Sequence, residues 1–214
     1  MQLAIVLMFA VAPAWAQDNS ACGSLSNHYG PFDYRTANSQ QKSLVESFHF
    51  TPRIEYLLPG GSNPWADDIS YTLRAFPNHH RALLTIQRLA EREKTDTPKS
   101  AQWSVACYFD RALRFQPKDV IVKMLYAGYL AKKNRVAEAT QQLDAAITLG
   151  EDEPFTQFNV GLVFLDMKNF DRALVQAHRA LAMGFTRPEL RDALIAAGKW
   201  VEPPAKTEEP TPKS

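Results

Sequence analysis

The stretch YAGYLAKKNRVAEATQQLDAAITLG (residues 126–150) matches the stretch NVGLVFLDMKNFDRALVQAHRALAMG (residues 159–184) further along the chain. Small and apolar residues recur between the two at a constant offset of 34 residues. The matched pairs are Ala127 with Gly161, Leu130 with Phe164, Val136 with Phe170, Ala139 with Ala173 and Ala146 with Ala180. The apolar residues follow helical spacing, and no segment from residue 67 onward alternates as a half-buried strand does. The pattern therefore predicts an all-α fold.

The period and the positions of the small residues resemble those of the tetratricopeptide repeat (TPR) family, in which small residues let two antiparallel helices approach closely. The resemblance implies a short helical solenoid with regular repeats at about 120–153 and 154–187, and a degenerate repeat at 79–119. Lys123 and Gln157 depart from the family, which usually has a bulky apolar residue at this position. An independent helical bundle is the alternative architecture.

The helical domain is expected to span residues 67–201. Thr186-Arg187-Pro188-Glu189 is typical of a capping box with a proline in the first turn, which predicts a cap helix at 187–199. Residues 17–66 are rich in Asn, Ser, Gly and Pro, so they form an N-terminal arm that is expected to be irregular. Residues 202–214 are rich in proline and charge, which predicts a disordered tail.

The first sixteen residues, MQLAIVLMFAVAPAWA, are typical of a signal peptide cleaved after Ala16. The stretch is too short and wrongly flanked for a membrane span, and no other segment is long and apolar enough to cross a bilayer. Ser20-Ala21-Cys22 resembles the end of a lipoprotein signal, but Asn19 stands where an aliphatic residue is wanted. We expect export, to the periplasm.

The chain has two cysteines, Cys22 and Cys107. An even pair in an oxidising compartment favours a disulfide bond over two free thiols. Two buried thiols and a redox pair are the alternatives, although no C-x-x-C spacing supports a redox pair.

The composition argues against several functions. Lys plus Arg number 24 and Asp plus Glu number 23, so the chain lacks the basic field that attracts nucleic acid. The sequence has no glycine-rich phosphate loop, no nucleophile elbow and no H-E-x-x-H helix, so we expect neither an enzyme nor a bound cofactor.

In the TPR family the first helices of the repeats line a concave groove. The residues that the resemblance places in the groove of this chain are Ile121, Met124, Phe155, Phe158, Leu162 and Leu165. This groove is apolar and lacks the Lys and Asn residues of the subclass that clamps a peptide carboxylate. An exposed apolar groove needs an occupant. We expect the aromatic-rich arm to fill it; an apolar segment of a partner protein is the alternative.

The arm contains an unusual run, Asn27 to Arg35. As a recognition loop it would present His28, Tyr29, Phe32, Tyr34 and Arg35, together with His79 and His80 at the start of a helix. The alternative is an ordered turn in which Gly30-Pro31 bends the chain, Asp33 pairs with Arg35 and the rings enter the core.

His79 and His80 follow Asn78, which is predicted to cap a helix. Adjacent helical residues point roughly 100° apart, so this pair cannot chelate a metal by itself, and we expect no metal site. The sequence favours an exported scaffold or adaptor that binds a protein or peptide partner. The alternative is a small periplasmic enzyme or metal-handling accessory, which would require His28, His49, His79 and His80 to converge.

Overall fold

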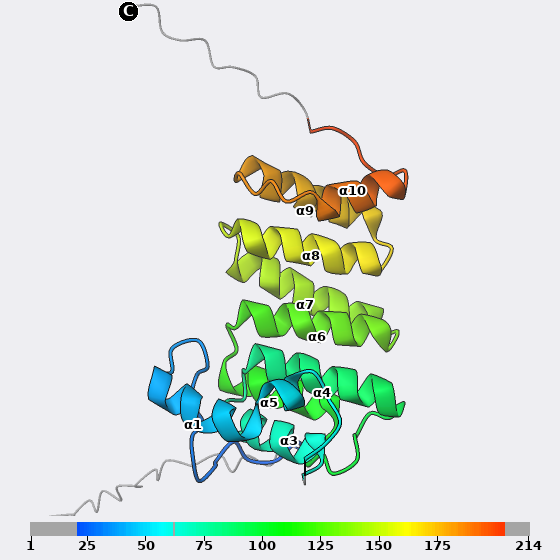
Figure 1. Ribbon diagram of the computed structural model, residues 1–214. Helices are drawn as coiled ribbons and strands as arrows, with labels where there is room; N and C mark the ends of the chain where they lie inside the picture. Colours follow the sequence, from blue (N-terminus) through cyan, green and yellow to red (C-terminus); the bar gives the residue numbers. More distant parts are fainter. Residues whose placement is uncertain (1–20, 62, 204–214) are drawn as a thin grey trace, which may run out of the picture.

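The computed structural model describes residues 21–61 and 63–203 of the 214-residue chain. These residues form ten α-helices and no strand, which confirms the all-α prediction (Figure 1). The helices are α1 (Ser39–His49), α2 (Pro52–Glu55), α3 (Trp65–Ala75), α4 (His80–Glu93), α5 (Val105–Phe115), α6 (Val120–Lys132), α7 (Val136–Leu149), α8 (Pro154–Asp166), α9 (Phe170–Ala182) and α10 (Glu189–Ala196).

Helices α6 and α7 form one close pair, and α8 and α9 form a second pair stacked on the first (Figure 1). The small residues of the 34-residue pattern are all buried where the helices meet. The turns inside the two pairs are also equivalent. Asn134 and Lys168, 34 residues apart, both adopt left-handed backbone conformations, with φ of 59° and 61°. The sequence period therefore reappears as a repeated backbone geometry.

Helix α10 packs on α8 and α9 and covers the last pair. It requires a small residue beneath it, because a side chain at Gly161 would run into the buried Leu190. The predicted capping box is wrong: α10 begins at Glu189 with no side-chain cap. The carboxylate of Glu189 pairs with Arg187.

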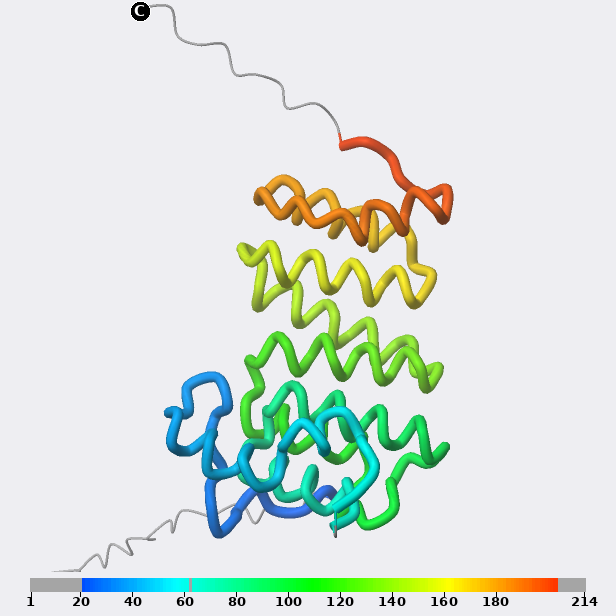
Figure 2. The backbone as a smooth tube through the Cα atoms, viewed as in Figure 1, coloured from blue at the N-terminus to red at the C-terminus, as the bar shows by residue number. Residues whose placement is uncertain are grey.

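The arm completes the other end of the molecule, beside α3, α4 and α5 (Figure 2). It is more helical than predicted, since α1 and α2 lie within it. Phe50 and Ile54 of the arm are buried in the main hydrophobic core. A second, smaller core forms where Val45 of α1 and the rings of Tyr29 and Phe32 pack around the end of α3. The arm is therefore part of the folded body.

The two positions that depart from the TPR pattern are accommodated differently. Gln157 is fully buried, and its Nε2 donates to the carbonyl of Gly150 (2.7 Å) at the end of α7. A polar side chain thus replaces the apolar contact by capping the preceding helix. Lys123 is half-buried, and burial lowers the pKa of its ammonium group because the charged form is desolvated.

Candidate functional site

His79 is the N-cap of α4, which corrects the prediction that Asn78 caps this helix. The backbone N–H of Ala82 donates to Nδ1 of His79 (3.1 Å). The neutral ring therefore carries its proton on Nε2, and Nε2 donates to Oε1 of Glu46 on α1 (3.1 Å). Burial lowers the pKa of His79, because the charged ring would be desolvated. A proton on Nδ1 would also break the hydrogen bond from the N–H of Ala82.

Glu46 joins the arm to α4. Its Oε1 accepts hydrogen bonds from the hydroxyl of Tyr34 (2.8 Å), from Nε2 of His79 (3.1 Å) and from Nη2 of Arg81 (3.0 Å). The bond from His79 is the main cause that lowers the pKa of Glu46 to about 2. The carboxylate is therefore ionised at neutral pH, and the junction holds a fixed negative charge shared among three donors.

Asn78 forms a second link between the arm and the helices. Its buried side chain accepts the N–H of Tyr34 (2.9 Å) and donates to Asp119 (2.9 Å), the N-cap of α6. His80 approaches the same carboxylate with Nε2 (3.1 Å). Burial raises the pKa of Asp119, but the hydrogen bonds from His80 and Asn78 outweigh it and the net pKa is lowered. The arm, α4 and α6 thus share one polar network.

The run from Asn27 to Arg35 has the geometry of an ordered turn. Gly30 adopts φ +90° against the carbonyl of Ala75, where no side chain would fit, and Phe32 N–H donates to that carbonyl (2.9 Å). Arg35 pairs with Asp33 (2.7 Å). The rings of Tyr29, Phe32 and Tyr34 pack into the smaller core, whereas His28 is exposed. The loop therefore anchors the arm.

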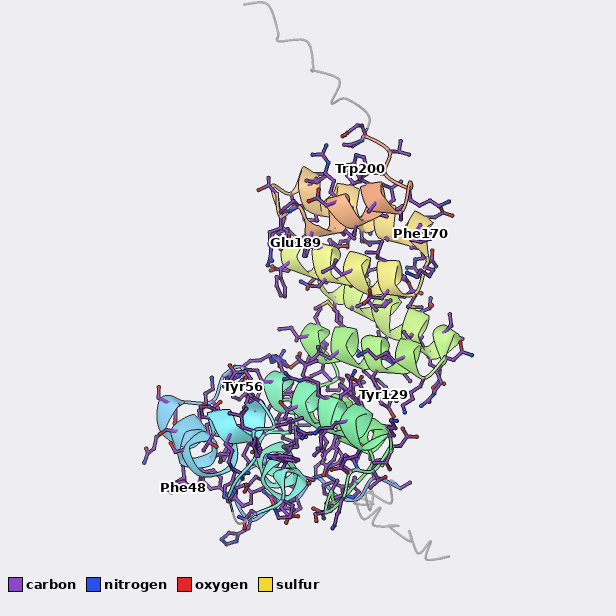
Figure 3. All side chains as sticks on the ribbon, turned by 45° about the vertical axis from the view of Figure 1, so that its right-hand side comes forward. Phe48, Tyr56, Tyr129, Phe170, Glu189 and Trp200 are labelled. Atoms are coloured by element: carbon purple, nitrogen blue, oxygen red, sulfur yellow. A yellow bond between two sulfur atoms is a disulfide. The ribbon has the colours of Figure 1, made fainter. Side chains whose placement is uncertain are left out.

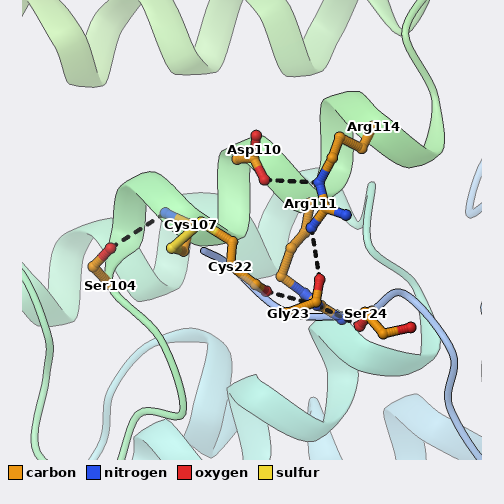
Figure 4. Close-up of a disulfide and its surroundings, with 8 residues drawn as sticks. All are labelled: Cys22, Gly23, Ser24, Ser104, Cys107, Asp110, Arg111 and Arg114. Atoms are coloured by element: carbon orange, nitrogen blue, oxygen red, sulfur yellow. Dashed lines mark hydrogen bonds and ion pairs between the residues drawn. A yellow bond between two sulfur atoms is a disulfide. The ribbon is translucent and has the colours of Figure 1, made fainter. Parts of the chain in front are cut away.

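The predicted disulfide between Cys22 and Cys107 is present and fastens the start of the arm to α5 (Figure 4). The buried Arg111 grips the same segment: its Nη1 donates to the carbonyls of Cys22 (3.0 Å), Gly23 (3.3 Å) and Ser24 (2.7 Å). Its guanidinium lies 3.8 Å from the ring centre of Trp103. Sequence reasoning missed Arg111, although an arginine at helical spacing within the buried face of α5 was a usable signal.

The histidines have separate partners. His49 meets Asp68 (3.0 Å), His79 meets Glu46 (3.1 Å), His80 meets Asp119 (3.1 Å), and His178 meets the carbonyl of Val201 (2.8 Å). His79 and His80 both approach the ring of Tyr34, but their polar atoms serve different carboxylates. Within residues 21–61 and 63–203, no three His, Cys, Asp or Glu side chains form a group that could hold a metal ion.

The predicted groove residues divide into two sets. Phe155 is 47% exposed, and Ile121, Leu162 and Leu165 are half-buried. Met124 and Phe158 are only 5% and 4% exposed, so their assignment to the groove surface is wrong. Phe158 is covered because the segment before α10 places Phe185 against it, with ring centres 5.0 Å apart.

The prediction that the arm fills this groove is also wrong. Helices α1 and α2 pack on α3 and α4, and the preceding loop reaches α5 and the N-cap of α6 (Figure 1). The disulfide to α5 and the contact of Gly30 with Ala75 hold the arm at this end. The arm therefore does not cover the face of α6 and α8.

Two hollows lie along α4, α6 and α8. One of about 340 Å³ is bounded by Ala90, Glu91 and Tyr129, and one of about 530 Å³ lies between α6 and α8 beside Gly128. Lys132 lines both, and its Nζ pairs with Glu91 (2.8 Å) at the boundary. Space is open above Gly128, since a side chain there would meet no atom within 4 Å.

Comparison of the chain with protein-family models and with curated proteins finds no match. None of the helices in the part of the chain that the structure describes is long and apolar enough to span a membrane. The predicted signal peptide at 1–16 and most of the predicted tail, residues 204–214, lie outside the described residues.

Proposed function

We propose that the protein is an exported TPR-like scaffold that binds another protein on the face formed by α4, α6 and α8. The observation that carries the proposal is the 34-residue period, which relates both the buried small residues and the backbone of the turns at Asn134 and Lys168. Repeated helix pairs of this kind stack into extended surfaces, whose usual work is to bind other macromolecules. The proposal includes no catalytic activity and no cofactor.

The surface itself supports binding. The first helices of successive pairs carry exposed apolar side chains, Leu84 on α4 and Phe155 on α8, and the two hollows lie between these helices. Exposed apolar side chains and preformed hollows on the same set of helices are suited to the side chains of a partner. The alternative class, an enzyme or metal-handling protein, would need the histidines to share a site, and they do not.

Export is supported by two features together. The predicted signal peptide would direct the chain out of the cytoplasm, and the Cys22–Cys107 disulfide would persist in an oxidising compartment. A periplasmic location is the one that we propose.

Site-specific photocrosslinking tests the binding face. A photoreactive phenylalanine analogue would replace Phe155 in the full chain, expressed with its own leader in a bacterium that exports it. The matched control would carry the analogue at Val175, which is similarly exposed on α9. We expect a discrete protein adduct from position 155 and none from position 175. No adduct, or the same adducts from both positions, would contradict the proposed face.

A further inference from the structure

The end of α2 presents two apolar side chains to solvent. Leu57 adopts φ 52°, a conformation that disfavours a bulky residue, and the N–H of Leu58 donates to the carbonyl of Arg53 (2.9 Å). This turn sends the side chain of Leu57 into the main core. Tyr56 and Leu58 point outward and are 62% and 49% exposed; Tyr56 is marked in Figure 3 where the arm meets α4.

Three side chains hold the backbone of this turn by hydrogen bonds to its carbonyl groups. Nη1 of Arg92 donates to the carbonyl of Leu57 (3.1 Å), and Nε1 of Trp65 donates to the carbonyl of Leu58 (2.8 Å). Thr85 of α4 donates to the carbonyl of Glu55 (3.2 Å), directly before Tyr56. A preorganised backbone loses little conformational entropy when a partner binds.

Arg88 of α4 adjoins this turn. Its Nη2 donates to the hydroxyl of Thr85 (3.3 Å), the same hydroxyl that holds the carbonyl of Glu55. Its Nε lies 3.4 Å from the carbonyl of Leu84, whose side chain is 37% exposed. Tyr56 and Leu58 thus lie on the turn that Thr85 holds, and Leu84 and Arg88 lie on α4 beside Thr85; we call these four exposed residues the arm–α4 patch.

The charge of Arg88 is not neutralised within the described residues, where its hydrogen bonds go to neutral oxygens. Arg81 on the same helix differs, since it pairs with Glu46 (3.0 Å) and Glu55 (2.9 Å). Glu91, one turn beyond Arg88, pairs with Lys132 (2.8 Å). The carboxylates that flank the patch are thus already paired with other basic side chains. The guanidinium of Arg88 can therefore donate hydrogen bonds to a carboxylate of another molecule.

We infer that the arm–α4 patch docks an acidic segment of a partner protein, with a carboxylate on Arg88 and an adjacent apolar side chain against Tyr56, Leu58 and Leu84. The inference rests on the proposed scaffold function and names the chemistry of its partner. Tyrosine and arginine are the side chains that most often anchor protein interfaces, and a guanidinium binds a carboxylate through two parallel hydrogen bonds.

A selection from a random dodecapeptide library on the full-length, disulfide-bonded protein tests this. We expect the enriched peptides to carry Asp or Glu next to an aromatic or aliphatic residue. In fluorescence anisotropy, Arg88→Glu and Tyr56→Ala should each weaken binding at least tenfold. The matched control Arg179→Glu, an exposed arginine on α9, should leave binding unchanged. A peptide with its acid changed to Lys should bind Arg88→Glu and not the wild type.

Three results would overturn the inference: no enriched peptide, enriched peptides without acidic residues, or acidic peptides that bind Arg88→Glu as tightly as the wild type. Peptides lost in Phe155→Glu but retained in Arg88→Glu would overturn the patch while leaving the proposed scaffold function intact. Because Arg88, Tyr56 and Phe155 are exposed, these substitutions should preserve the fold, which circular dichroism and thermal unfolding of each variant would verify.

Discussion

His79 and Glu46 lie with Nε2 and Oε1 3.1 Å apart, and the helix cap on the other ring nitrogen determines that His79 is the donor. One histidine thus joins two tasks: it begins α4 and it binds the arm. The cap requires the neutral ring, because Nδ1 accepts a hydrogen bond there, whereas Nε2 can donate to Glu46 in either protonation state.

Stability should fall as the pH drops below 6.5, the ordinary pKa of histidine. The pKa of His79 is lowered in the folded state, so the unfolded chain binds the proton at a higher pH than the folded chain does. Acidification therefore stabilises the unfolded state relative to the folded state. The contribution is up to about 1.4 kcal/mol for each pH unit between the unfolded and folded pKa values. Urea unfolding at pH 5.5 to 8 measures it. His79→Asn keeps a capping side chain that does not titrate, so its stability should depend less on pH.

His178→Asn is the control for that experiment, because His178 bonds the carbonyl of Val201 and belongs to α9, at the opposite end of the molecule from the arm. It should retain the pH dependence of the wild type. A His79→Asn variant with an unchanged slope would show that another group is responsible.

Removal of the disulfide should destabilise the fold by about 4 kcal/mol, because the bond closes a long loop in the unfolded chain. The Cys22→Ser, Cys107→Ser double variant, unfolded in urea, measures this. Wild-type protein kept reduced should unfold at the same midpoint as the double variant. A double variant as stable as the oxidised wild type would mean that the arm is held by its noncovalent contacts alone.

Arg111→Met should cost about 3 kcal/mol, because it removes the hydrogen bonds that Nη1 donates to the carbonyls of Cys22, Gly23 and Ser24 beneath the arm. Arg114→Met is the matched variant: Arg114 also donates to the carbonyl of Gly23 but its side chain is more exposed, so its loss should cost about 1 kcal/mol or less. Chemical denaturation compares the two. Equal losses would contradict the role assigned to Arg111.

Substitution of two helical glycines by alanine should have different effects on the free energy of unfolding. Gly128→Ala should raise the free energy of unfolding by about 0.5–1 kcal/mol, because alanine favours the helix and the added methyl meets no neighbour. Gly161→Ala should give no such gain, since the methyl would press on the buried Leu190 and on Gln176. Thermal unfolding of the two variants decides this; a clear stabilisation by Gly161→Ala would show that α10 can shift without loss.

Structural features that depend on residues close together in the sequence could be predicted from the sequence. The regular pairs follow from apolar periodicity, and their turns recur at the same offset because equivalent local sequences adopt equivalent backbones. The cysteine pairing followed from there being two cysteines in a chain expected to be exported. The arm was harder: its Gly, Pro and Asn content indicates loops, and its two short helices are stabilised mainly by packing against α3 and α4.

The sequence by itself determined the helical class and the period of the regular pairs, and it favoured a disulfide between Cys22 and Cys107. Only the tertiary structure decided that the arm covers α3 and α4, that Phe158 is buried beneath Phe185, and that His79 meets Glu46. Periodicity reports which face of a helix is apolar, and it is a local property. The element that covers that face, and the partner of each buried polar group, depend on contacts between residues tens of positions apart, which only the packed chain brings together.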